Sequence, residues 1–134
     1  LYDLLPIPMT EAAVKYVAER ILRVQDILGK RLVIENVSTY LMPNAQMSEA
    51  EFLYKICEKA DCGILLDVNN VYVSSRNHNF DPIGYLKAMP KHRVVQFHVA
   101  GHQDNGNWLL DTHDHEIRDE VWDLYEKAVD MLFA

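Results

Sequence analysis

Apolar residues that recur at steps of three and four predict helices along much of the chain. The first is expected to begin after the N-cap residue Thr10 and to end near Leu28, with Gly29 just beyond its end. A second begins at the capping box of residues 48–51 and ends near Asp61. The face of the first helix that we expect to be buried contains Val14, Val17, Ile21, Val24 and Leu28.

Two further helices follow from the pattern. Asp81-Pro82 predicts a short helix that ends before Pro90, because proline is favoured in the first turn and cannot continue a helix. Residues 117–132 have the apolar stripe of a last amphipathic helix. We assign no regular structure to residues 68–73 and predict loops at 1–9, 37–46, 74–79 and 100–116.

Three short aliphatic runs lie between the helices and predict strands. They cover residues 31–35, 63–67 and 93–98, and they end on Glu35, Asp67 and His98. The steps from Glu35 to Asp67 and from Asp67 to His98 are 32 and 31 residues, about one strand–helix–strand unit each. Each strand therefore ends on a residue that can bind a metal ion or move a proton.

The alternation of strands and helices predicts an α/β fold with a parallel sheet, because helical crossovers make successive strands run in one direction. All three strand ends then meet at the carboxyl edge, which carries the active site of a β/α barrel. Three strands cannot close a barrel and leave two exposed edges. The chain is therefore either a three-stranded layered domain or a fragment of a longer β/α barrel. We favour the fragment, with residues 1–134 as one partial barrel domain.

Composition excludes several classes of function. The formal net charge is −7 and no basic run is present, which argues against binding to nucleic acid or to anionic lipid. No apolar run approaches the ~20 residues of a membrane span. Cys57 and Cys62 lack a CxxC spacing, and we expect buried, reduced thiols in a cytoplasmic protein. A local disulfide is the alternative.

The strand ends predict a metal site. An anionic carboxylate at the end of an apolar strand is costly unless charge or hydrogen bonds compensate it, and a divalent cation shared by Glu35, Asp67 and His98 would do so. Asn69 and Asn70 add amide groups beside Asp67, either to orient ligands or only to form a turn. The donor set of carboxylate and imidazole without thiolate suits iron, manganese or zinc.

The long loop near the C-terminus holds further ligand types. In an extended segment Asp111 and His113 point to the same side and can grip one ion, and His115 continues the alternation. The candidate ligands exceed the number that one ion needs, which indicates two or three ions. A solvated, histidine-rich loop is the alternative. His78 and His92 stand apart in predicted loops and are expected to be surface residues.

Several motifs together resemble the DUF692 (UPF0276) family, also called multinuclear non-haem iron-dependent oxidative enzymes. They are Asp-Leu-Leu-Pro-Ile-Pro at 3–8, Ile-Glu-Asn at 34–36, Leu-Asp-Val-Asn-Asn-Val-Tyr at 66–72, Phe-His-Val-Ala-Gly-His at 97–102 and Asp-Thr-His-Asp-His at 111–115. The resemblance covers the whole chain in order. It implies a xylose-isomerase-like TIM barrel that holds two or three iron ions and uses dioxygen to modify cysteines of a ribosomally made peptide.

The resemblance also implies roles for single residues. Glu35, Asp67 and His98 would bind a shared iron cluster, and Asn70 (in preference to Asn69), Asp111 and His113 would hold a further iron. His102 and His115 would support ligands or contact substrate. The implied partners are a small cysteine-containing precursor peptide and a protein that delivers it. The family barrel is longer than this chain and has further ligands before Leu1 and after Ala134, so we expect the isolated chain to be inactive or to associate through its edges.

Two other functions fit the same residues. One is a metal-dependent isomerase or hydrolase on the same type of barrel, in which Glu35 or His98 acts as a base or activates water beside a redox-inert ion. The other is a non-catalytic peptide-binding fragment with an incomplete metal site.

Overall fold

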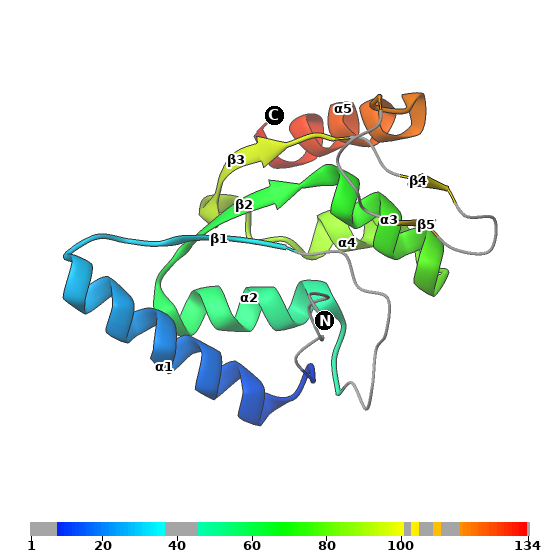
Figure 1. Cartoon of the computed structure of the whole chain (residues 1–134). Coiled ribbons are helices and arrows are strands. Elements are labelled where there is room, and N and C mark those ends of the chain that lie inside the picture. The colour runs from blue at the N-terminus through cyan, green and yellow to red at the C-terminus, as the bar shows by residue number, and fades with distance from the viewer. Residues whose placement is uncertain (1–7, 37–45, 101–102, 105–108, 111–115, 134) are drawn as a thin grey trace.

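A computed structural model describes residues 8–36, 46–100, 103–104, 109–110 and 116–133 of the chain. Its main sheet has three parallel strands in the order β1-β2-β3, namely β1 (Val33–Glu35), β2 (Gly63–Asp67) and β3 (Val94–His98). The strands run side by side with their carboxyl ends at one edge (Figure 1). The predicted α/β fold with a parallel sheet is confirmed.

The helices begin and end at residues that local chemistry selects. They are α1 (Glu11–Leu28), α2 (Glu49–Ala60), α3 (Val68–His78), α4 (Pro82–Ala88), the 3₁₀ helix η1 (Lys91–Arg93) and α5 (Asp119–Phe133). The Thr10 hydroxyl accepts a hydrogen bond from the Ala13 amide and caps α1. Ser48 caps α2 in the same way by accepting from the Glu51 amide. Gly29 ends α1 with φ +65°, as predicted for a residue just beyond a helix.

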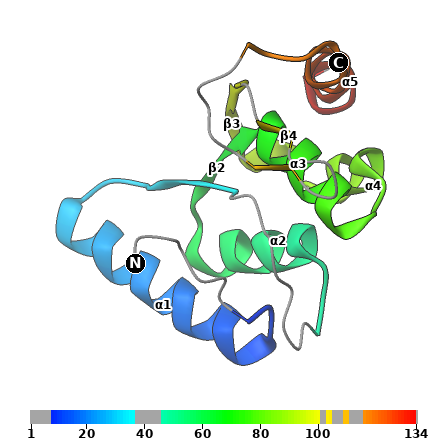
Figure 2. The ribbon, with the colours of Figure 1, turned by 45° about the vertical axis from the view of Figure 1, so that its right-hand side comes forward.

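Helices α1, α2, α4 and α5 pack side by side in this order, and α3 contacts both α4 and α5. Figure 2 shows α1 beside α2 under the sheet and α5 at the far end, next to β3. The β2 side chains that are fully buried among these helices are Ile64 and Leu66, and they form the centre of the core. A row of helices on one face is what a segment of a β/α barrel requires.

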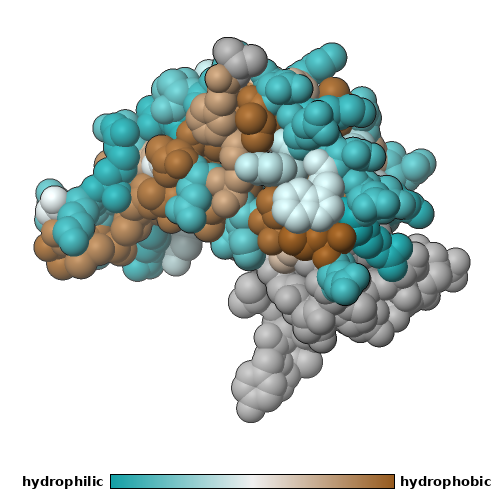
Figure 3. All heavy atoms as spheres, turned by 90° about the horizontal axis from the view of Figure 1, so that it is seen from above, coloured by the Kyte–Doolittle hydropathy of each residue, from teal (hydrophilic) through white to brown (hydrophobic). Residues whose placement is uncertain are grey.

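The opposite face of the sheet is less covered. Val33, Glu35 and Gln96 reach solvent there, and Leu65 is half-buried. Figure 3 shows brown, hydrophobic side chains exposed among hydrophilic ones on the surface seen from above. The asymmetry means that β2, the central strand, has Ile64 and Leu66 fully buried on one face, whereas Leu65 on the other face is half-buried.

The stretch after Asp67 is helical, which corrects the prediction. Residues 68–79 had been expected to lack regular structure and to form a loop, but α3 occupies Val68–His78. Its β-branched and amide side chains have low helix propensity, and tertiary burial overrides that preference. Asp67 caps the helix by accepting from the Asn70 amide, and Asn79 ends it with φ +54°. His78 therefore lies on a helix, half-buried, and not in a loop.

Two other predictions need correction. Val24 and Leu28 were expected to be buried, but both are exposed, because the buried stripe of α1 runs through Val14, Ala18 and Ile21. The predicted loop at 100–116 contains a short antiparallel pair, β4 (Gln103–Asp104) and β5 (Leu109–Leu110). The predicted loops at 1–7 and 37–45 lie outside the described residues.

The two cysteines are buried free thiols, as predicted. Their sulfur atoms are 3.6 Å apart at the end of α2 and the start of β2, and the hydrogen bond between them raises the pKa of Cys57 and lowers that of Cys62. Among the described helices, none combines the length and the apolar character needed to cross a bilayer.

Candidate metal centre

Glu35, Asp67 and His98 meet at the carboxyl edge of the sheet. In β2 and β3, Asp67 lies directly opposite His98, and in β1 and β2, Glu35 lies opposite Leu65. Residues opposite each other in a parallel pair, and residues two apart in one strand, project from the same face. All three side chains therefore project from the open face, away from Ile64 and Leu66.

A register shift brings His98 into this position. The pairing changes from Ile64 opposite Val94 to Leu65 opposite Gln96, so β3 contains one extra residue at this point. Without that residue Asp67 would face Phe97, and His98 would lie beyond the end of the pair. A single-residue shift in a strand moves side chains to the other face, so this bulge decides which residue joins the site.

His98 contacts both carboxylates directly. His98 Nδ1 lies 2.9 Å from Asp67 Oδ2 and 3.3 Å from Glu35 Oε1. The Asp67 side chain is 0% exposed, whereas those of Glu35 and His98 are 37% and 43% exposed. Burial acts to lower the pKa of His98, but the hydrogen bonds and charges of the two carboxylates outweigh it and raise that pKa. When it is protonated, the imidazole compensates the charge of the carboxylates.

The geometry fits a metal ion. One ligand atom from each residue lies within 4.8 Å of the other two. Two atoms bound to one ion at about 2.0–2.2 Å can be no more than about 4.4 Å apart, so small side-chain rotations suffice. Two carboxylates and one imidazole suit iron, manganese or zinc. The half-exposed Glu35 and His98 leave a route by which an ion can enter.

The main chain around Asp67 is fixed by amide side chains. Asn36 Nδ2 donates to the Asp67 carbonyl at 3.0 Å, and the Asp67 amide donates to Asn36 Oδ1 at 2.7 Å. Asn70 Nδ2 donates to the Asn36 carbonyl at 2.7 Å. Asn70 thus lies beside the site and helps to hold it, while its role as a ligand stays a prediction.

The remaining predicted residues divide into two groups. Asn69 is fully buried in the first turn of α3. His102, Asp111, His113 and His115 lie outside the described residues.

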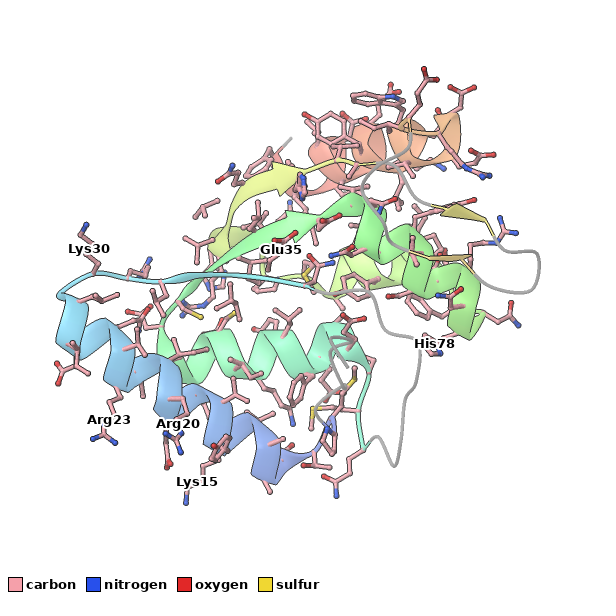
Figure 4. The ribbon with its side chains drawn as sticks, viewed as in Figure 1. Lys15, Arg20, Arg23, Lys30, Glu35 and His78 are labelled. Carbon is pink, nitrogen blue, oxygen red and sulfur yellow. The ribbon has the colours of Figure 1, made fainter. Side chains whose placement is uncertain are left out.

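Figure 4 shows Glu35 beside β2, while Lys15, Arg20 and Arg23 of α1 point away from the sheet. These basic side chains therefore do not approach the carboxylates.

Three residues near the site were not predicted. Asn36, Glu49 and Tyr85 are buried residues with polar groups, and Asn36 bonds the main chain of Asp67 at the carboxyl end of β2. The sequence could have pointed to Asn36, because this residue directly follows Glu35, a candidate metal ligand at the end of a strand. Glu49 was hidden within a capping box, where an acid is expected for local reasons.

The fold and this site define an α/β protein with a carboxylate–imidazole cluster able to hold a metal ion. Residues 1–133 match the protein family described as the RiPP precursor modification enzyme MbnB/TglH/ChrH, where RiPP denotes a ribosomally synthesised and post-translationally modified peptide. The chain belongs to this family.

Curated relatives share the similarity along nearly the whole chain. A UPF0276 protein of Acinetobacter baylyi is 68% identical over 127 residues, which cover 94% of this chain and 44% of the relative. A UPF0276 protein of Shewanella oneidensis is 53% identical over 129 residues, which cover 96% of this chain and 46% of the relative. The predicted UPF0276 membership is confirmed, and the chain spans less than half the length of these relatives.

Proposed function

We propose that the protein containing this chain is a metal-dependent enzyme that oxidatively modifies cysteine residues of a ribosomally made peptide with dioxygen. Two or three iron ions are the proposed cofactor, and a small cysteine-containing precursor peptide, brought by a delivering protein, is the proposed substrate. The proposal places the enzyme in the cytoplasm on a xylose-isomerase-like barrel, of which this chain forms a part.

The observation that carries the proposal is the contact of Glu35, Asp67 and His98 at the carboxyl edge of a parallel sheet, in a chain of this family. The family match supports a peptide substrate. The donor set supports a metal ion that accepts oxygen and nitrogen ligands. The open face of the sheet supports access for a large substrate, because Glu35 and His98 remain partly exposed.

Each residue has a defined part in this proposal. Bound iron would supply the activation of dioxygen and the redox change that cysteine oxidation needs. Asp67 offers Oδ2 while its Oδ1 holds the first turn of α3, so its orientation is set before any ion arrives. Glu35 offers a carboxylate from the neighbouring strand. His98 must release the proton that the two carboxylates stabilise before its Nδ1 can bind a metal ion.

The test uses the full-length protein with a cysteine-containing precursor peptide. We expect purified protein to contain iron, to consume dioxygen and to change the mass of the peptide. Asp67→Asn and Glu35→Gln should lower the metal content and abolish the mass change. The control is Glu51→Gln, which makes the same chemical change at an exposed position on α2 and should leave both unchanged.

Other outcomes would point to the other functions. Zinc or manganese alone, with no dioxygen consumed on any peptide, would contradict the oxidative proposal and favour an isomerase or hydrolase. Peptide binding without metal binding would favour a non-catalytic binding protein.

A further inference from the structure

The side chain of Asn36 continues the sheet where β1 has ended. The last residue of β1, Glu35, lies opposite Leu65, so β2 extends two residues further, to Asp67. Asn36 bonds both main-chain groups of Asp67, donating to its carbonyl at 3.0 Å and accepting from its amide at 2.7 Å. The Asn36 side chain thus replaces a missing ladder pair and fixes Asp67 relative to the residue that follows Glu35.

Two buried polar residues lie behind Asn36. Glu49, in the first turn of α2, is 6% exposed, and Tyr85, on α4, is 5% exposed. The Tyr85 hydroxyl lies close enough to both the Glu49 carboxyl and the Asn36 side chain for each of them to affect its pKa. Three buried polar groups, from α2, from α4 and from the residue after β1, therefore lie near one another.

Two buried oxygen atoms in this group, one on Glu49 and one on Tyr85, need an explanation. Neither Glu49 Oε2 nor the Tyr85 hydroxyl makes a hydrogen bond of ordinary geometry with the described part of the chain. Each such buried group costs about 1–3 kcal/mol, so its presence in the core calls for an explanation. Burial raises the pKa of Glu49 to about 8, while the Tyr85 hydroxyl acts to lower it. At neutral pH the Glu49 carboxyl is therefore largely uncharged and can donate a proton to a hydrogen bond.

We propose that Glu49 and Tyr85 are positioning residues, which act through Asn36 to hold the Glu35 and Asp67 carboxylates at the separation that a metal ion requires. The pair touches neither metal nor substrate. It constrains the amide of Asn36, and Asn36 constrains the main chain of Asp67. The metal-binding part of this proposal rests on the proposed function, but the effect on Asp67 does not.

The first measurement needs no metal. In the full-length metal-free protein, hydrogen exchange of the Asp67 amide reports the bond to Asn36 Oδ1. We expect Tyr85→Phe and Glu49→Gln to speed this exchange by about 10-fold, roughly the effect of losing the hydrogen bond between the Asp67 amide and Asn36 Oδ1. The Gly63 amide, which donates to the Leu32 carbonyl at the other end of β2, should keep its exchange rate.

The second measurement is the affinity for Co²⁺, followed by its visible absorption. We expect the same two variants to bind Co²⁺ about 10- to 100-fold more weakly than the parent, as is typical when groups behind metal ligands are removed. Glu51→Gln, a neighbouring exposed acid on α2, is the matched control and should change neither measurement.

The two measurements separate the possible failures. Equal changes at Asp67 and Gly63, or no change at Asp67, would show that the pair is only part of the core and would overturn the inference. Faster exchange at Asp67 alone supports it. If the parent protein binds no Co²⁺, the proposed metal site fails, while the exchange result still decides whether Glu49 and Tyr85 position Asp67.

Discussion

Asp67 combines two contacts that depend on different properties of its side chain. Oδ1 accepts the Asn70 amide and caps α3, which requires only an oxygen atom. Oδ2 contacts His98, which benefits from negative charge. Substitutions that keep the oxygen and remove the charge can therefore separate folding from metal binding.

We expect Asp67→Asn to reduce metal affinity at least about 10-fold while keeping most of the stability, because the amide oxygen still caps α3. Asp67→Ala should lose the same affinity and about 1 kcal/mol more stability, a typical value for a lost cap. Urea unfolding and metal titration of both variants check this. Equal stability of the two variants would contradict the capping role.

We expect His98 to make metal binding depend on pH. The carboxylates of Glu35 and Asp67 raise its pKa, so the proton competes with the metal ion up to a higher pH than for an ordinary histidine. We expect metal affinity to fall as the pH is lowered through that raised pKa. Titration of Co²⁺ between pH 5 and 9 measures it, and an affinity independent of pH would exclude Nδ1 as a ligand.

We expect Glu49 to make the stability of the fold depend on pH. Its pKa rises from 4.5 to about 8 on folding, so the folded state holds the proton more tightly. The stabilisation is complete below pH 4.5 and is lost as the pH rises towards about 8. Between pH 4.5 and about 8, the free energy of unfolding should fall by about 1–3 kcal/mol less in Glu49→Gln than in the parent protein. Unfolding at several pH values measures it, and identical slopes for parent and variant would contradict it.

The C-terminal end of α1 depends on the backbone conformation of Gly29. Gly29 has φ +65°, and an added Cβ would meet no atom within 4 Å, so any cost of a side chain comes from the backbone alone. We expect Gly29→Ala to destabilise the fold by about 1 kcal/mol. Gly84→Ala is the control, because Gly84 lies inside α4 with open space around it and alanine favours a helix. Thermal unfolding should move in opposite directions for the two variants.

The whole molecule has two features that favour association. Among the described strands, β1 and β3 are the outer strands of the main sheet, and Val33 and Val95 are exposed on them. Unpaired strand edges and exposed aliphatic side chains promote pairing between chains. We expect the isolated 134-residue chain to self-associate and the full-length protein to do so less. Sedimentation of both checks this, and a stable monomer of the isolated chain would contradict it.

Local chemistry explains which elements the sequence could predict. Thr10, Gly29 and Ser48 mark helix ends through bonds to their own neighbours, and the aliphatic run 63–67 marks a strand buried on one face by helices. These signals depend on a few adjacent residues. The α3 helix had no such signal, because its helix-disfavouring residues are stabilised by burial among distant elements.

The sequence by itself determined the three strand ends, and the tertiary structure decided how they meet. Glu35, Asp67 and His98 could be chosen because each ends an aliphatic run at a regular spacing. The bulge in β3 then aligned His98 with Asp67, and the Asn36 side chain joined β1 to β2 beyond the last ladder pair. Register and buried polar contacts join residues some 30 positions apart, so the pattern along one chain does not contain them.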